Sequence, residues 1–200
     1  MTQEEKDVYN NNMIQFYKPT KSGNGSSCTF SSNGKDKSMY TSLMKQFSWD
    51  NSTGRANFKG NQNNPDAKVN VKFSMTEIAG FINAIEKNSE FKGYHSSERQ
   101  IIRFDFAPYV KDGHQKGFTY RLQREAKDDS TNKVSFLIGF KPEELVLIRE
   151  FLLFVLRVVF ETDQRSQQEN FQQKENFHQK NVKNEENSFE ESELNDDDIW

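Results

Sequence analysis

Hydrophobic and polar residues alternate along four stretches in the middle of the chain, which is the pattern of half-buried β-strands. The turn signals Asp112-Gly113 and KDDSTN (127–132) predict that antiparallel hairpins join the last three stretches. Upstream, MYTSLMKQFSW (39–49) and GRANFKG (54–60) are expected to add two or three strands. The four alternating stretches are VNVKF (69–73), IIRFDF (101–106), GFTYRLQRE (117–125) and KVSFLIGF (133–140).

Two further stretches, 74–88 and 141–161, carry apolar residues at helical spacing instead. Ser74 is a suitable N-cap for the first helix, with Glu77 at the capping-box offset, and Pro142 suits the first turn of the second helix. Each predicted helix directly follows a predicted strand.

The two strand-to-helix junctions align with each other at an offset of 67 residues, which pairs Phe73 with Phe140 and Glu77 with Glu144. This predicts an α+β fold built from a duplicated unit of antiparallel strands followed by one helix. A chance match of apolar spacing is the alternative explanation.

Composition divides the chain into three parts. Residues 1–37 include the stretch KSGNGSSCTFSSNGK, rich in Gly, Ser and Asn, and are expected to form a flexible N-terminal segment. Residues 38–161 are predicted to form the folded domain. Residues 162–200 carry 11 acids and 4 bases and are rich in Gln and Asn, so we expect a disordered acidic tail.

Several segments resemble, in order and spacing, the Whirly family of single-stranded DNA-binding proteins: FSMTEIAGFI (73–82), SEFKGYHSSERQIIRFDFAPYVKDG (89–113), FTYRLQRE (118–125) and VSFLIGFKPEELVLIREFLLFVLRVV (134–159). The resemblance implies two roughly perpendicular four-stranded antiparallel sheets, two helices that pack subunits into a tetramer, and nucleic acid lying across sheet faces and edges. The family's lysine-glycine-lysine-alanine motif is only partly echoed, by Gly54-Arg55-Ala56. GFKPEEL (139–145) is equally similar to the coactivator-type single-stranded DNA-binding fold.

The chain ends in DDDIW, which resembles the acidic tip of bacterial and phage single-stranded DNA-binding proteins. Those tips dock onto replication and repair proteins, so the resemblance implies a partner-binding role for this segment. The last sixteen residues contain eight acids and no base, and we expect them to fold back over a basic surface until nucleic acid displaces them. A solubilising tail is the alternative. The predicted partner-binding residues are Asp196, Asp197, Asp198, Ile199 and Trp200.

Single-stranded nucleic acid is held by cations on its phosphates and aromatic rings under its bases. The alternation of the strands places several cations on the face opposite the apolar positions, and aromatic residues lie among them. The alternatives are an ordinary charged sheet surface for the cations and core packing for the aromatic residues. The predicted nucleic-acid-binding residues are Lys45, Phe47, Trp49, Arg55, Lys59, Lys68, Lys72, Arg103, Tyr120 and Arg121.

The second predicted helix is apolar nearly all round, so it is expected to need a second buried surface between subunits. We predict a homo-oligomer, with a tetramer favoured. The run FLLFVLRVVF (151–160) is too short for a membrane span of about 20 residues and contains Arg157. The predicted interface residues are Leu147, Phe151, Phe154 and Val158.

Enzymatic activity is not expected, because the sequence has no P-loop, no GxGxxG or GxSxG motif and no metal-ligand spacing. We therefore predict no metal and no cofactor. The N-terminus resembles neither a secretory signal nor a transit peptide, which favours the cytoplasm, in a bacterial or phage-infected cell. The predicted function is sequence-independent binding of single-stranded DNA in replication, recombination or repair. The alternatives are an RNA-binding or RNA-annealing protein of the same fold, and an adaptor oligomer that binds no nucleic acid.

Overall fold

The computed structural model describes residues 12–33, 38–129 and 131–161. The main body of the fold lies within the compact unit Met1–Val159. The predicted acidic tail and its DDDIW tip lie outside the described residues. Within the described residues, no helix is both long enough and apolar enough to cross a membrane.

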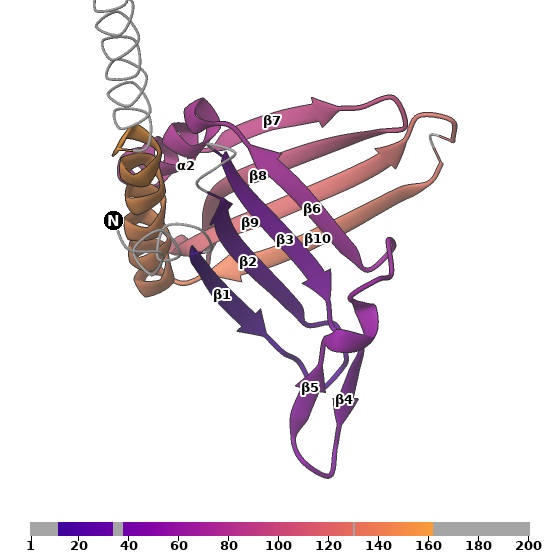
Figure 1. The fold of residues 1–200 in the computed structure, drawn as a ribbon. Coiled ribbons are helices and arrows are strands. Elements are labelled where there is room, and N and C mark those ends of the chain that lie inside the picture. The colour runs from indigo at the N-terminus through magenta and orange to yellow at the C-terminus, as the bar shows by residue number, and fades with distance from the viewer. Residues whose placement is uncertain (1–11, 34–37, 130, 162–200) are drawn as a thin grey trace, which may run out of the picture. The chain divides into compact units, whose positions relative to one another are not determined.

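The first sheet is antiparallel, with the strand order β1-β2-β3-β6. A short hairpin and a 3-10 turn are inserted between its last two strands, and Figure 1 shows this hairpin projecting from the body of the fold. The elements of this half are β1 (Asn12–Lys18), β2 (Ser26–Asn33), β3 (Ser38–Lys45), β4 (Ser48–Asp50), β5 (Arg55–Asn57), η2 (Lys59–Asn61) and β6 (Lys68–Phe73).

The second sheet is antiparallel too, with the strand order β10-β9-β8-β7. The predicted Asp112-Gly113 turn joins β8 to β9, and both of its residues have the positive φ that a tight hairpin of this kind requires. The strands of this half are β7 (Phe91–Ser96), β8 (Gln100–Lys111), β9 (His114–Ala126) and β10 (Lys133–Phe140).

The two sheets pack face to face, with β10 lying against β2 and β3, and their strands cross in Figure 1. Between them lies one core, whose centre is aromatic: the Phe140 ring contacts both the Phe30 ring and the Phe106 ring. The Tyr120 hydroxyl and the Thr41 hydroxyl form a 2.8 Å hydrogen bond across the core, which ties β9 to β3. Burial raises the pKa of Tyr120 well above its ordinary value.

Each sheet runs directly into a helix, so the predicted duplicated unit is confirmed. Helix α2 (Met75–Lys87) follows β6, and a second helix, residues 142–161, follows β10. Ser74 and Glu77 form the predicted capping box. In the second half, the Lys141 backbone N–H donates to Glu144 at 2.8 Å, which repeats the 2.8 Å contact from the Ser74 N–H to Glu77. The described fold is therefore α+β, with two four-stranded antiparallel sheets and two helices.

The first sheet begins earlier than the sequence analysis expected. Residues 12–33, assigned there to a flexible segment, form β1 and β2. Small polar residues dominate β2, where Cys28 and Phe30 are the buried apolar residues. In the edge strand β1, Phe16 is the buried apolar residue. Composition alone suggests a loop, whereas pairing within the sheet decides the structure.

The helix at 142–161 buries more of its apolar surface within one chain than the sequence analysis expected. Phe151 and Val158, predicted to lie at a subunit interface, are buried in the protomer, and Phe154 is half-buried against the core. Leu147 is 59% exposed and remains available for another surface. The predicted tetramer stays a prediction.

Candidate nucleic-acid interface

The outward side of the first sheet carries three rows of side chains that cross all four strands. We call this surface the first outer face. It is polar but nearly uncharged, because hydroxyl and amide groups occupy most of its centre. The three rows are Met13-Ser31-Tyr40-Lys72, Gln15-Thr29-Ser42-Asn70 and Tyr17-Ser27-Met44-Lys68.

No carboxylate lies in these three rows, and the two charged residues are lysines on β6. Lys68 and Lys72 lie on either side of Asn70, and the Lys72 ammonium is 5.6 Å from the centroid of the Tyr40 ring. The Gln15 amide donates to the Thr29 hydroxyl at 3.0 Å, and this hydrogen bond links the side chains of β1 and β2 on the face. The first outer face thus combines positive charge, an aromatic ring and many hydrogen-bonding groups.

The second sheet also has three outward rows that cross all four of its strands, and we call them the second outer face. Its cations are more numerous, but acids lie among them. Arg103 contacts Glu125 at 2.8 Å, and Lys133 approaches the same carboxylate at 3.6 Å. The Glu125 carboxylate therefore neutralises part of the positive charge of the second outer face. The rows are Lys92-Asp105-Arg121-Leu137, Tyr94-Arg103-Gln123-Ser135 and Ser96-Ile101-Glu125-Lys133.

Beside the first outer face, the projecting β4–β5 hairpin borders an open hollow of about 670 Å³, which we call the hairpin hollow. Tyr17 belongs both to the hollow and to the first outer face, so the two surfaces are continuous. Most of the lining is apolar or aromatic, and its charged members are both cations. The residues that line it are Tyr17, Pro19, Trp49, Gly54, Arg55, Ala56, Asn57, Phe58 and Lys59.

Phe47 lies just before this hairpin and is 57% exposed. Its ring covers Gly60, where a β-carbon would collide with the ring atoms of Phe47. The glycine therefore allows an aromatic ring to lie flat on the backbone at the surface.

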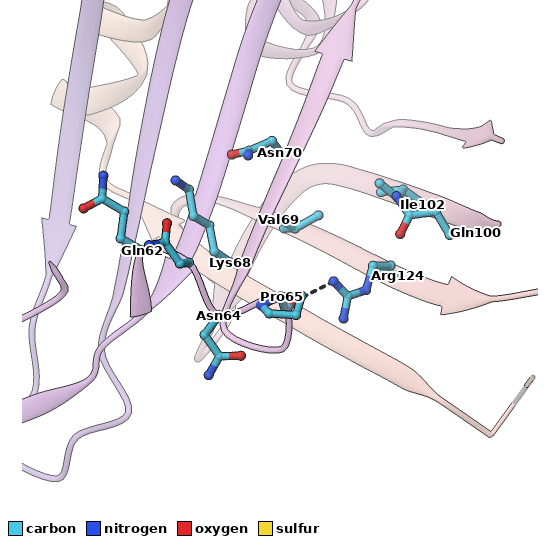
Figure 2. Close-up of a pocket in the computed structure, with 10 residues that line it drawn as sticks. Gln62, Asn64, Pro65, Lys68, Val69, Asn70, Gln100, Ile102 and Arg124 are labelled. Carbon is cyan, nitrogen blue, oxygen red and sulfur yellow. Dashed lines mark hydrogen bonds between the residues drawn. The ribbon is translucent and has the colours of Figure 1, made fainter. Parts of the chain in front are cut away.

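At the opposite edge of the first sheet, a second recess of about 320 Å³ lies between β6 and the second sheet (Figure 2). Lys68 and Asn70 reach it from β6, and Arg124 reaches it from β9. Arg124 donates to the Pro65 carbonyl at 2.6 Å and pairs with Asp66 at 2.9 Å. These contacts engage the guanidinium and hold the Pro65–Asp66 loop against the second sheet.

The structure separates the predicted nucleic-acid-binding residues into three groups. Lys68 and Lys72 lie on the first outer face, whereas Arg103 and Arg121 lie on the second. The third group gathers at the hairpin: Phe47, Trp49, Arg55 and Lys59.

Two predicted residues have other surroundings. Tyr120 is 0% exposed and hydrogen-bonded within the core, so its ring cannot stack on a base, and this prediction is wrong. Its position in the alternation, with Phe118 and Leu122, already placed it on the inward side. Lys45 is half-buried, and its ammonium lies 5.0 Å from the centroid of the Phe136 ring.

Sequence reasoning missed the contribution of the N-terminal strands. Tyr17, Gln15 and Thr29 were overlooked because their segment was taken as a loop, and Tyr40 was not singled out. A signal was present: Ile14 and Phe16 alternate with Met13, Gln15 and Tyr17 along β1, as a half-buried strand requires.

Among the described residues, no group of three or more His, Cys, Asp or Glu side chains is arranged to hold a metal ion. Cys28 is buried, and burial raises the pKa of its thiol well above its ordinary value.

Comparison with known proteins adds a structural likeness without a sequence likeness. No protein-family model matches this chain. No curated protein matches it either. A crystal structure of MRP1/MRP2 from Trypanosoma brucei is similar, with a TM-score of 0.54 and 16% identity, over 77% of this chain and 89% of that one. A guide RNA-binding protein complex bound to a guide RNA is similar with a TM-score of 0.52 and 15% identity, over 76% of this chain and 94% of that one.

These solved structures have a Whirly-like fold. At this level of identity, the likeness establishes the shared fold. The resemblance seen in the sequence is thus confirmed for the architecture of the described domain.

Proposed function

We propose that this protein binds single-stranded nucleic acid along the first outer face, with RNA as the favoured ligand. The observation that carries the proposal is a sheet surface with two lysines, a tyrosine under one of them, and no carboxylate in its three rows. A polyanion meets no repulsion from that surface, and bases can stack on its exposed rings.

Two considerations place RNA before DNA, which reverses the order given by the sequence. One solved structure with this fold contains a guide RNA. The first outer face is also rich in Ser, Thr, Gln and Asn, whose side chains can exchange hydrogen bonds with a ribose 2′-hydroxyl. Single-stranded DNA remains the second candidate, because base stacking and phosphate contacts on this face do not depend on the sugar.

The deciding experiment is fluorescence anisotropy with the full chain and three labelled ligands of equal length: single-stranded RNA, single-stranded DNA of the same sequence, and an RNA duplex. We expect the single-stranded RNA to bind most tightly, with an affinity that falls steeply as salt rises. Equal binding of RNA and DNA single strands would support the second candidate. Absence of binding to all three at low salt would overturn the proposal and leave the adaptor hypothesis.

A further inference from the structure

The hairpin hollow presents aromatic rings from three separate parts of the chain. Tyr17 comes from β1, Trp49 from β4, and Phe58 from the link between β5 and η2. The Tyr17 and Phe58 rings meet edge to face, with centroids 5.4 Å apart and an interplanar angle of 61°. Tyr17 is 53% exposed, so part of this aromatic surface remains in contact with solvent. The arrangement offers flat, apolar surface to a flat ligand.

The charge of the hollow is positive. Arg55 and Lys59 are its charged residues, and neither forms an ion pair within the described part of the chain. Asp50 lies opposite Arg55 in the β4–β5 ladder, yet its carboxylate accepts hydrogen bonds from the hydroxyls of Ser52 and Thr53, at 2.6 Å and 2.8 Å. The Asp50 carboxylate is therefore engaged in hydrogen bonds within its own turn.

Aromatic surface together with two cations fits a ligand that is flat and apolar at one end and anionic at the other. A nucleotide has this chemistry, and a volume of about 670 Å³ leaves ample room for one base with its sugar and phosphate. The hollow also joins the first outer face through Tyr17, so a strand lying on that face can continue into it.

We propose that the hairpin hollow is a nucleotide subsite that takes up one base of the bound strand. The base stacks on Trp49 and Tyr17, and its phosphate lies near Lys59 and Arg55. This inference rests on the proposed function, because it assumes that a single strand lies on the adjoining face. The subsite holds one nucleotide of the strand in a pocket, whereas its neighbours lie on the first outer face.

Tryptophan fluorescence tests the inference directly. The chain has two tryptophans, so the substitution Trp200→Phe leaves Trp49 as the sole tryptophan. This full-length variant is titrated with unlabelled oligouridylate while Trp49 emission is followed, and a parallel titration follows the anisotropy of the same oligonucleotide carrying a label. We expect Trp49 emission to be quenched with the same midpoint as the anisotropy change.

The two titrations separate the inference from the function on which it rests. Oligonucleotide binding with unchanged Trp49 emission would overturn the nucleotide subsite and leave the proposed function standing. No anisotropy change would overturn both.

Two further variants, made in the Trp200→Phe background, test the roles of the ring and the cation. Tyr17→Ala is paired with Tyr109→Ala, and Lys59→Gln with Lys111→Gln; both controls change exposed residues near the tip of the β8–β9 hairpin. We expect Tyr17→Ala to weaken oligonucleotide binding about tenfold and to reduce the quenching, and Lys59→Gln to weaken binding severalfold with a shallower salt dependence. Equal effects of the hairpin variants and their controls would overturn the assignment.

Discussion

The two outer faces are built on the same plan but differ in how they distribute charge. Each covers a four-stranded antiparallel sheet that runs into a helix, and each has three outward rows. The first holds two lysines and no acid, whereas the second mixes four cations with Asp105 and Glu125. The second face has more cations, yet the first is the more open to a polyanion.

The comparison shows which parts of a duplicated unit are constrained. The inward positions of both sheets must pack into a single core, and the two helix starts keep equivalent contacts at Glu77 and Glu144. Outward positions carry no such constraint, so the two faces have diverged in chemistry. We therefore expect the differences between the two outer faces to determine binding, and variants of each face can test this.

The largest effect is expected from charge reversal on the first outer face. In the double variant Lys68→Glu/Lys72→Glu, two phosphate contacts become repulsive, so affinity for single-stranded RNA should fall by about 100-fold or more. The slope of log affinity against log salt should also become shallower by about 1.4, since each single-strand phosphate contact contributes about 0.7. Anisotropy titrations across a salt series measure both quantities.

The matched control is Lys92→Glu/Lys133→Glu on the second outer face, where the same number of lysines is reversed. We expect a change of less than about threefold, because those lysines already lie near Glu90 and Glu125. An equal loss in both double variants would mean that total charge, rather than the first outer face, governs binding.

A smaller effect should separate two tyrosines, one on each outer face. Tyr40 on the first outer face lies beneath the Lys72 ammonium, while Tyr94 on the second is 70% exposed. Tyr40→Ala should weaken RNA binding by about 1 to 2 kcal/mol, the cost of one lost base stack, and Tyr94→Ala should leave the affinity unchanged. Thermal unfolding of both variants checks that the fold is retained. A larger loss of RNA affinity from Tyr94→Ala than from Tyr40→Ala would indicate that the nucleic acid binds the second outer face instead.

The contrast between the faces also explains what could be predicted from sequence. Strands β8, β9 and β10 were predicted correctly because they carry large apolar residues at every second position, such as Phe104 and Phe106, and because Asp112-Gly113 marks a tight turn. The edge strand β7 was not predicted, because its sequence, FKGYHS, buries no residue fully. The helix starts at Ser74 and Pro142 were equally clear, since capping is encoded locally. These features depend on short-range chemistry.

The first outer face could not be assembled in the same way. The serines of β2, with Thr29, look like a loop until β1 and β3 pair with them on either side. The hairpin hollow joins Tyr17 to Trp49 across 32 positions, and no local pattern predicts that approach. Lys68 and Lys72 were found because they alternate with Val69, Val71 and Phe73 on one strand.

Removing an acid from the second outer face should increase the affinity of that face for RNA. Glu125→Gln releases Arg103 and Lys133, so the second face should gain affinity for RNA, by about two- to fivefold. The gain is best measured in the Lys68→Glu/Lys72→Glu background, where the first face no longer masks it. A steeper salt dependence is expected together with the gain. An unchanged affinity would indicate that charge alone does not make this face an interface.

The smallest effect concerns two turns that aspartates hold, one in each half of the fold. Asp50 accepts hydrogen bonds from the backbone and hydroxyl groups of Ser52 and Thr53, which lowers its pKa to about 2. Asp129 accepts hydrogen bonds from the backbone and hydroxyl groups of Thr131, and its pKa is lowered too.

Both shifts are downward from the usual value of about 3.9, so each carboxylate stabilises its turn above that pH and loses the contribution as pH falls through its lowered pKa. Carboxyl carbon chemical shifts, followed by NMR from pH 5 to pH 1.5, should show Asp50 titrating below Asp129, because more donors hold its ionised form. The β4–β5 turn should therefore keep its geometry to lower pH than the turn between β9 and β10. A lower titration midpoint for Asp129 than for Asp50 would mean that the hydrogen bonds assigned to the Asp50 turn do not persist in solution.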